Sequence, residues 1–565
     1  MIDIIINGQS AVIDNIEDIG IVSRFPNVSA FDNEQASELE INVDTITVRL
    51  ETKDQIIAWK DSYGAMVGIP TIIKQGTLSL DYYVDLTEGA IYSDHYVTCK
   101  LKKRKGADNF FGVAKGTTFE LLAAQGLIFP TVNIPYVIVP DNQVELGVTL
   151  SISIFVMTQT VLNEAQILEA LIAEAFAAVG GASAALAAAA IAKTSIQAIK
   201  VVALGFALEK LLTSLKELIF PSIRDFKGAT VKSLISTYCA SKGYTFQSSL
   251  LDSLPDISVL PVPLIKGKKS IFKFTQNQLK DSFTKGYPTS SDGIISTVGG
   301  LLNAMETTFN ARVKVRNGVV ELERRDFWKT QTAVQIAGYF TDQDTRTNRH
   351  ILNTDEAFIR QYIHYQNDPQ DTHTSDNFDY SVTEKGASNV NQIAPDLNLL
   401  KGLQDKAIPF AQGIAKTEFT FIEKTALALF KLIDDVLGTN TSVNIEKRKG
   451  VLQISQQFYS VPKLLIQTNG RQPSDYLSKI GAPALAANYH AIDYIENNSY
   501  SIHEMPAKMN LDEFEQMVYQ EIVNVDGSNV ELLEISYNLY DKRAELIFKK
   551  PNDWAIGKIT TFEVN

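Results

Sequence analysis

The adjacent residues His503 and Glu504 form the segment that most resembles a metal-binding motif. Such a pair opens the helical zinc motif of metalloproteases, which needs a second histidine one helical turn after the first. Here Pro506 would disturb that helix, and Ala507 occupies the place of the second histidine. We therefore predict no zinc site at this position.

Two carboxylates farther upstream have the spacing of the first ligands of a calcium loop. These are Asp342 and Asp344. A calcium loop then needs a third oxygen ligand and a glycine that makes the turn, but Arg346 and Thr347 stand in those places. The spacing therefore does not predict a calcium loop.

A third group of polar residues could hold a hard cation, because it gathers several oxygen ligands in one polar stretch. It consists of Asp368, Asp371, His373, Asp376 and Asp379. The alternative, a solvated loop without a ligand, is the interpretation that we prefer for this group.

Other catalytic motifs are absent from the sequence. It has no glycine-rich phosphate loop with a lysine and no nucleophile elbow, and only six histidines could act as bases. Two distant carboxylates that cleave peptidoglycan would leave no local pattern, so a cell-wall lysin stays open as an alternative. We predict that the chain is not an enzyme, with no catalytic residue, no metal and no cofactor.

Composition places the chain among ordinary globular proteins with several cores. Its 565 residues predict about four domains, and its net charge of -13 argues against a primary role in coating nucleic acid. The basic stretch at residues 100–105 is expected to be a solvated turn between strands. Two cysteines, Cys99 in an expected strand and Cys239 in an expected helix, exclude a disulfide scaffold and favour assembly in reducing cytosol. The N-terminal segment has no pattern of an export signal.

Alternating apolar residues predict strands, and these dominate both ends of the chain. At the start, Asn7 and Gly8 predict a tight hairpin turn. It joins a strand that contains Ile4 and Ile6 to a returning strand that contains Ala11 and Ile13. Strands are expected over 46–50, 82–86 and 96–99, and near the end of the chain one strand is expected at Leu533, Ile535 and Tyr537 and a second at Ala544, Leu546 and Phe548. No repeat of 20 to 50 residues is apparent, which disfavours a solenoid.

The clearest hairpin is centred on Asn317 and Gly318. A two-residue turn places Val315 opposite Val320 on a core face, with Lys314 opposite Glu321 and Arg312 opposite Glu323 on an ion-paired, exposed face. Helices are expected where apolar residues recur at helical spacing, over 231–239, over 294–309 behind a cap at 290–292, and over 398–437. A second hairpin is expected to pair 443–445 with 452–454.

The fold class that we predict is mainly β with α, that is α+β, in several barrel-like or sandwich-like domains. The expected regions are an N-terminal β-rich domain at 1–158, an Ala-rich helical insert at 159–222, an α+β domain at 223–340 that contains the 312–323 hairpin, a polar loop-rich connection at 341–395, and a C-terminal α+β domain at 396–565 that ends in strands.

The Ala-rich insert is unusually apolar. No residue between Ala175 and Ala192 is charged, a run that only just reaches the length needed to cross a hydrocarbon layer. Its small residues favour close helix packing, so we expect a helical hairpin broken at Gly180 and Gly181 and buried within an oligomer. Insertion into a membrane is the alternative. The candidate residues of this axial bundle or membrane-active segment are Leu168, Ile172, Phe176, Val179, Leu186, Ile191, Ile199, Leu204, Phe206 and Leu211.

The segment from Gly300 to Trp328 resembles a pattern in tail hub proteins of phages and prophages of Bacteroidetes-type bacteria. In that pattern a helix ending in MFN leads into a hairpin that closes with EPRDDF. Phe309 and Asn310 occupy the first set of places, and Glu323, Arg324, Arg325, Asp326 and Phe327 occupy the second. Arg324 stands where proline is usual, and the second aspartate is missing. The resemblance covers roughly the C-terminal half of the chain and does not include the Ala-rich insert.

The resemblance implies a structural subunit of the virion that assembles in the host cytoplasm. It implies β-barrel domains arranged as a ring, in a homotrimer that joins the sixfold tail tube to the tail tip or baseplate. Phage DNA would pass through the lumen without specific binding, because an acidic wall repels it. We add the hypothesis that three copies of residues 161–220 form a plug at the axis, with contact to a host membrane as a further partner. The competing readings are a tail-associated lysin and a pore-forming or toxin protein that uses residues 161–220.

Overall fold

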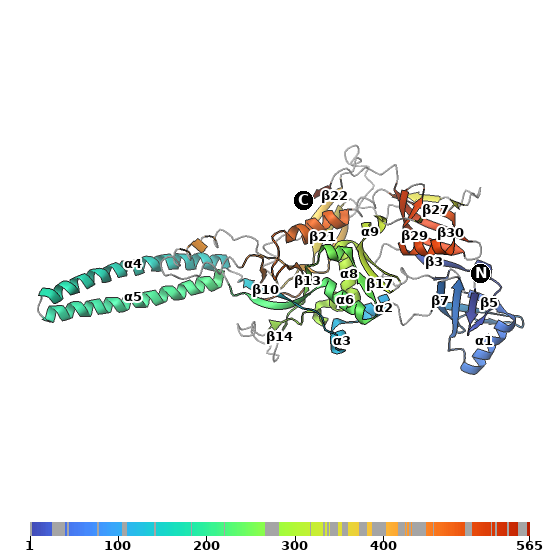
Figure 1. Ribbon diagram of the computed structural model, residues 1–565, viewed down its shortest axis with the longest axis horizontal. Coiled ribbons are helices and arrows are strands. Elements are labelled where there is room, and N and C mark those ends of the chain that lie inside the picture. Colours follow the sequence, from blue (N-terminus) through green and yellow to red (C-terminus); the bar gives the residue numbers. More distant parts are fainter. Residues whose placement is uncertain are drawn as a thin grey trace.

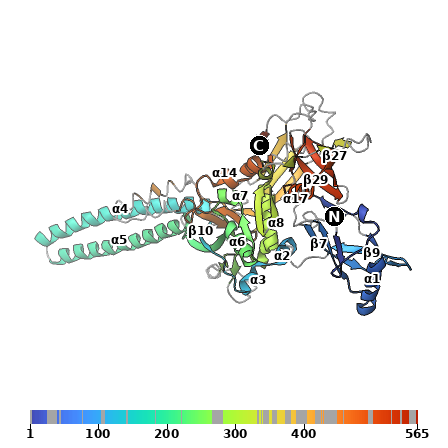
Figure 2. The same cartoon turned by 45° about the vertical axis from the view of Figure 1, so that its right-hand side comes forward.

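The computed structural model shows an elongated chain, with a long two-helix arm at one end and two β-rich units at the other (Figure 1). A turn of the view by 45° preserves this arrangement (Figure 2). The structure describes residues 3–24, 40–41, 45–75, 78–103, 110–139, 143–181, 184–219, 221–265, 282–316, 318–330, 334–335, 338–339, 349–352, 360–371, 381–386, 403–415, 424, 427–428, 431, 448–455, 457–491, 500–520, 522–525, 528–538, 542–551 and 562–564.

The first β-rich unit is a seven-stranded sheet with one long helix, α1 (Leu50–Tyr63). Its strand order is β2-β1-β6-β7-β9-β5, and β8 pairs with β9. The strands are β1 (Asp3–Ile6), β2 (Gln9–Ser10), β5 (Thr45–Arg49), β6 (Ile69–Gln75), β7 (Leu78–Asp85), β8 (Ile91–Tyr92) and β9 (Tyr96–Lys103). The opening hairpin is confirmed, because Ile6 lies opposite Gln9 and both Asn7 and Gly8 have positive φ.

The second β-rich unit is built mainly from residues 500–551, with a helix α17 (Leu511–Gln520) and added strands from earlier parts of the chain. Its sheet has nine strands in the order β18-β28-β29-β30-β27-β19, with β20, β3 and β4 off this path. They are β3 (Gly20–Arg24), β4 (Glu40–Ile41), β18 (Val334–Gln335), β19 (Gly338–Tyr339), β20 (Arg349–Leu352), β27 (Tyr500–Lys508), β28 (Ile522–Val525), β29 (Ser528–Asn538) and β30 (Arg543–Pro551).

The two strands predicted near the end of the chain are confirmed, and they pair antiparallel with each other. Ile535 lies opposite Leu546 and Tyr537 opposite Ala544, whereas a bulge puts Leu532 opposite Phe548 in place of Leu533. The bulge is an extra residue that periodicity alone does not reveal.

The two units share one plan. In each, a strand leads into the helix and three longer strands follow, so that β5-α1-β6-β7-β9 matches β27-α17-β28-β29-β30. The first unit has the two-residue strand β8 in addition, between β7 and β9. The pairing also matches, because the antiparallel order is β6-β7-β9-β5 in the first unit and β28-β29-β30-β27 in the second. The chain thus contains the same strand–helix–three-strand unit twice, at positions more than 400 residues apart.

The two units are joined through a strand that the first contributes to the second. Strand β3 pairs antiparallel with β29, with Ile21 opposite Tyr537 and Arg24 opposite Glu534. One continuous hydrophobic core contains buried residues of both units, among them Ile46 of β5 and Leu546 of β30. The units therefore lie side by side (Figures 1 and 2).

The middle of the molecule has a six-stranded sheet in the order β24-β26-β13-β11-β10-β25 and a three-stranded sheet in the order β12-β17-β16. Their strands are β10 (Val132–Val139), β11 (Arg224–Thr230), β12 (Thr245–Gln247), β13 (Ile257–Leu260), β16 (Ala311–Arg316), β17 (Val319–Arg324), β24 (Ala411–Gln412), β25 (Leu452–Ser455) and β26 (Lys463–Ile466). A short pair, β14 (Leu264–Ile265) and β15 (Ser282–Phe283), lies beside them.

Short helices surround a large shared core in this middle region. They are α2 (Phe110–Gly116), α3 (Phe119–Ala124), α6 (Val231–Ser241), α7 (Ser249–Ser253), η4 (Ser290–Ser296), α8 (Val298–Phe309), α9 (Arg325–Thr330), α14 (Tyr476–Ile480), α15 (Ala482–Leu485) and η6 (Ala486–His490). A further short helix, η1 (Ile16–Asp18), lies near the first unit instead. All five apolar residues predicted to form one face of the 231–239 helix are buried, and Gly243 follows it with positive φ. The predicted 294–309 helix is correct from Val298 onward, but Ile294 is 67% exposed.

Residues 360–408 and 562–564 together form a four-stranded sheet. It consists of β21 (Arg360–Tyr365), β22 (Ser381–Gly386), β23 (Leu403–Ile408) and β31 (Phe562–Val564), in the order β23-β21-β22-β31. The prediction of a helix over 398–437 is therefore wrong for 403–412, because β23 and β24 lie there. Long-range pairing with β21 and β26 overrides the local pattern. The predicted partner strand at 443–445 lies outside the described residues. Leu452 pairs with Tyr136 of β10.

The arm consists of two long helices, α4 (Gln143–Gly181) and α5 (Ala184–Ile219), which lie along each other (Figure 1). It connects β10 to β11, and these two strands pair antiparallel, with Tyr136 opposite Arg224. The chain therefore leaves the six-stranded sheet from one strand and returns to the adjacent one. At about 1.5 Å per residue, α5 is about 54 Å long.

Candidate functional site

The residues that the sequence singled out on the arm divide by the exposure of their side chains. Leu168, Leu204 and Leu211 are half-buried. Ile172, Ile199 and Phe206 are exposed, at 38%, 70% and 62%. The side chains of Phe176, Val179, Leu186 and Ile191 lie outside the described residues.

Polar contacts fix α5 against α4. The side-chain amide of Gln197 donates to the Glu164 backbone carbonyl at 3.0 Å, and Lys200 Nζ lies 2.5 Å from Glu164 Oε1. The contact with Lys200 lowers the pKa of the Glu164 carboxyl, and Gln197 lowers it further. Thr194 Oγ1 donates to the Leu171 carbonyl at 3.2 Å. These contacts set which face of α5 is turned toward α4.

The opposite face of α5 is apolar and exposed. Ile196, Ile199, Val202 and Phe206 are 68%, 70%, 57% and 62% exposed, and Ala203 between them is exposed too. At about 100° per residue, these side chains lie on the side of the helix away from Gln197 and Leu204. The sequence-based list included Ile199 and Phe206 but missed Ile196 and Val202, although their spacing was visible in the sequence.

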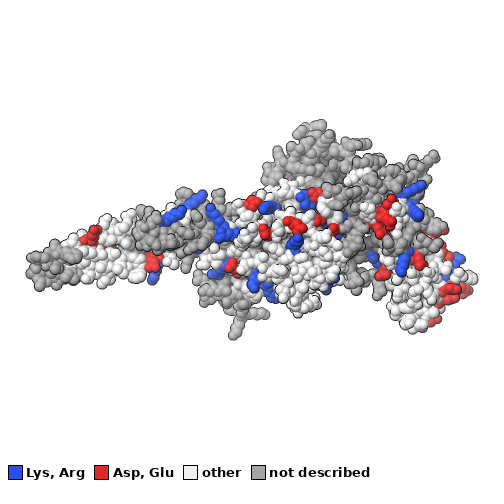
Figure 3. All heavy atoms as spheres, in the orientation of Figure 1, with Lys and Arg blue, Asp and Glu red and all other residues white. Residues whose placement is uncertain are grey.

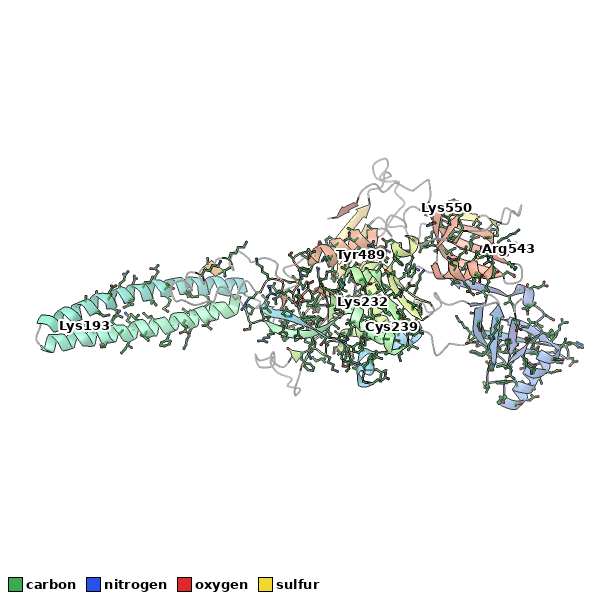
Figure 4. All side chains as sticks on the ribbon, viewed as in Figure 1. Lys193, Lys232, Cys239, Tyr489, Arg543 and Lys550 are labelled. Atoms are coloured by element: carbon green, nitrogen blue, oxygen red, sulfur yellow. The ribbon has the colours of Figure 1, made fainter. Side chains whose placement is uncertain are left out.

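The outward face of α4 has a different composition. Exposed polar side chains recur along it, at Gln159, Asn163, Gln166 and Glu169. Exposed apolar residues such as Leu162 and Ile167 are scattered between them and do not form a stripe. Charged atoms are sparse along the face of the arm that Figure 3 shows, and Lys193 lies toward its far end (Figure 4).

Two of the five acidic-cluster residues are buried, so the prediction of a solvated loop is wrong for them. Asp371 is 0% exposed, and its Oδ2 lies 2.6 Å from Nζ of Lys463, which is also 0% exposed. The backbone N–H of Ser455 donates to Asp371 Oδ1 at 2.9 Å. The ammonium also lies 5.3 Å from the centre of the Tyr459 ring.

Asp368 is the second buried carboxylate, and it accepts hydrogen bonds mainly from backbone N–H groups. It accepts hydrogen bonds from the N–H groups of Gln370, Ser460 and Val461 and from the Ser460 hydroxyl. These contacts tie the segment after β21 to the turn before β26. The carboxyl therefore has a structural role. His373, Asp376 and Asp379, like Asp342 and Asp344, lie outside the described residues.

The remaining sequence candidates are also structural. His503 and Glu504 lie in strand β27, not in a helix. Cys99 and Cys239 are free, buried in a strand and a helix as predicted, and burial raises the pKa of each thiol to about 12. The basic stretch begins inside strand β9, where Lys102 bridges Asp85 and Glu88, so the turn predicted at that point is wrong.

The hairpin that carries the family resemblance connects the middle region to the second unit. Its predicted register is confirmed, with Val315 opposite Val320 and Arg312 opposite Glu323. Its charged face is not exposed, however, because Lys314 and Glu323 are 8% and 4% exposed.

Specific partners hold these buried charges. Glu323 accepts hydrogen bonds from the N–H and hydroxyl of Ser249, and Lys314 lies over the Trp328 ring at 4.2 Å. Arg325 Nη2 donates to Glu531 Oε1 of β29 at 2.6 Å. This half of the resemblance motif therefore holds two parts of the molecule together.

Neither a candidate metal cluster nor a candidate membrane-spanning helix is present among the residues that the structure describes. In that part of the chain, histidine, cysteine and acidic side chains do not come together in a group of three that could hold a metal ion. None of the helices there is both long and apolar enough to span a membrane.

No protein-family model matches the chain, and no curated protein matches it. The surfaces of the duplicated units and of the arm are thus the features on which an interpretation of function depends.

Proposed function

We propose that this chain is a structural subunit of a bacteriophage tail, a hub or baseplate protein that assembles as a homotrimer and joins the tail tube to the tail tip. In this proposal its work is done by surfaces that bind other copies and neighbouring tail proteins. The resemblance of residues 300–328 to tail hub proteins is the starting point.

The observation that carries the proposal is the duplicated unit. The two strand–helix–three-strand units share one core and lie side by side at one end of the molecule. Three copies of the chain would present six such units around a threefold axis. A ring of six equivalent positions is what a sixfold tail tube requires of the protein beneath it, whereas the single middle region of each chain would suit a threefold tip.

The finer fold assignments belong to the same proposal. The two sheets would act as barrel-like ring segments, and the arm from α4 to α5 would be an inserted helical hairpin between paired strands β10 and β11. Because β10 and β11 are adjacent, such an insertion needs no change in the sheet that carries it.

Charge supports the proposed passage for DNA. The chain carries 65 acidic and 52 basic residues, a net charge of -13. A ring of three such chains would surround its lumen with an overall negative potential, which repels phosphates and lets DNA pass without specific binding.

The proposal is tested by the mass and shape of the purified particle. Light scattering should give about three times 62.4 kDa, and negative-stain class averages should show a threefold particle with six lobes at one end. A monomer at micromolar concentration would contradict the proposal. Release of soluble fragments from purified cell-wall material would instead favour the lysin.

A further inference from the structure

The outward face of α5 has the pattern of a second packing seam. Ile196, Ile199, Ala203 and Phe206 stand at i, i+3, i+7 and i+10, the alternation of three and four residues that brings helices together in coiled coils. One side of α5 already packs against α4, so the helix carries apolar stripes on two opposite sides. A helix that met only one neighbour would need only one such stripe.

Exposure shows that the second stripe has no partner of comparable size within the described chain. Its three large members are 62% to 70% exposed, and Val202 at its margin is 57% exposed. The outward face of α4, with Gln159, Asn163 and Gln166, shows what a solvent-facing side of this arm looks like. Because the outward face of α4 is polar and that of α5 is apolar, the contact with a partner belongs to α5.

The stripe is best matched by another copy of itself. When identical helices pack in parallel around an axis, each residue of the seam meets its own counterpart, so one apolar stripe supplies both sides of the contact. Of the charges near the seam, Lys200 is already paired with Glu164 of its own α4, and Lys210 takes the seam position after Phe206, where it would face the Lys210 of another copy. Glu209 and Lys210 end the stripe at the side of the sheet.

We infer that α5 helices of different copies of this chain pack in parallel along the stripe Ile196, Ile199, Ala203 and Phe206, with α4 on the outside. The pairing of copies follows from the stripe alone. The number of copies that meet at the seam, three, rests on the proposed trimer.

Cysteine cross-linking of the full chain tests the seam. Ile196→Cys and Phe206→Cys should each form a disulfide-linked dimer under mild oxidation, because parallel packing puts each position beside itself. The native thiols give no background, since Cys99 and Cys239 are buried. Gln166→Cys, on the outward face of α4, is the matched control and should stay unlinked. Links that form only when the Ile196→Cys and Phe206→Cys chains are mixed would show antiparallel packing and overturn the parallel seam.

A charge substitution gives an independent measurement. Ile199→Glu should raise the concentration for half-assembly by at least about tenfold, because it puts a carboxylate into an apolar contact. The side chain is 70% exposed in one copy, so the substitution leaves the fold of that copy intact. Ile167→Glu on α4 should leave assembly unchanged.

The outcomes separate this inference from the proposed function. A six-lobed threefold particle without cross-links and insensitive to Ile199→Glu would overturn the seam and leave the hub proposal standing. Cross-links in a particle without such a ring would support the seam and contradict the hub proposal. Flotation of the wild-type chain with phosphatidylcholine and phosphatidylglycerol vesicles, together with a lack of cross-links, would assign the stripe to a membrane and overturn the inference.

Discussion

Lys463 and Asp371 form an ion pair that solvent does not reach, between strand β26 and the segment after β21. Burying two charges costs several kcal/mol, which their attraction offsets only while both are present. The role of the pair is therefore structural. The pair holds together segments that are 92 positions apart in the chain, together with Asp368, whose carboxylate binds the backbone of Ser460 and Val461.

Removal of one partner should therefore be costly. We expect Lys463→Met to lower the free energy of unfolding of the middle region by about 3–5 kcal/mol, since it leaves a buried carboxylate without its counter-charge. Urea unfolding measures this loss. The exposed pair of Lys285 with Glu120 is the control, and Lys285→Met should cost less than about 1 kcal/mol. An equal effect of the two changes would contradict the buried pairing.

Asp292 is the residue with the clearest dependence on pH. Burial raises the pKa of its carboxyl to about 6, against the hydrogen bonds from Thr289 and Val262, which lower it. The unfolded chain has a pKa near 4, so the folded state holds this proton more tightly. Its stabilising contribution is full below about pH 4 and is lost as the pH rises through about 6.

Comparison with Asp292→Asn isolates this effect. The difference in unfolding free energy, wild type minus variant, should fall between pH 4 and pH 7 by on the order of 2–3 kcal/mol, because only the wild type loses a proton. Denaturant titrations at the two pH values measure it. The same difference at both values would show that the pKa is not raised.

At the scale of elements, β3 is the strand that joins the duplicated units. It leaves the first unit and pairs with β29 of the second, with Ser23 opposite Ile535. Both Ser23 and Ile535 are buried. The joint therefore combines backbone hydrogen bonds with a shared core, and the two units should unfold together.

Proline in β3 should break this joint. We expect Ser23→Pro to uncouple the units, so that thermal unfolding followed by calorimetry shows an earlier transition for the second unit, because proline removes an N–H and restricts φ in a strand within the sheet. Ser23→Ala keeps the N–H and should retain a single transition for the two units. If the proline variant unfolds like the alanine variant, β3 does not couple them.

At the scale of the whole molecule, the arm and the body are separable. The arm joins the six-stranded sheet through adjacent strands, and α4 packs mainly against α5. Helices this long are stabilised chiefly by that packing. We therefore expect the body to fold without the arm.

Replacement of residues 141–220 by a short Gly-Ser linker should leave the body folded. The linker has only to join β10 and β11, because these two strands pair antiparallel and the ends that the arm connects lie side by side. Cys239, inside the core of the middle region (Figure 4), reports on the result: it should stay unreactive toward a thiol reagent, as in the full chain. A reactive thiol would show that the body depends on the arm.

Local patterns in the sequence determined the hairpins and the short amphipathic helices. The registers of the 7–8 and 317–318 turns and the buried stripe of α6 follow from positive-φ residues and periodicity, which act over a few residues. The apolar character of the arm was visible in the same way. The sequence also predicted Cys99 in a strand and Cys239 in a helix, where the structure has them.

Tertiary structure alone decided which elements meet. The strands at 403–412, the burial of Lys314 and Glu323, the Lys463–Asp371 pair and the duplicated units depend on contacts between residues far apart in the chain. Strand patterns specify which face is buried but not which strand lies beside which, because apolar faces of equal period are interchangeable. For the same reason the sequence predicted an apolar arm, and only the fold showed which side of α5 is left uncovered.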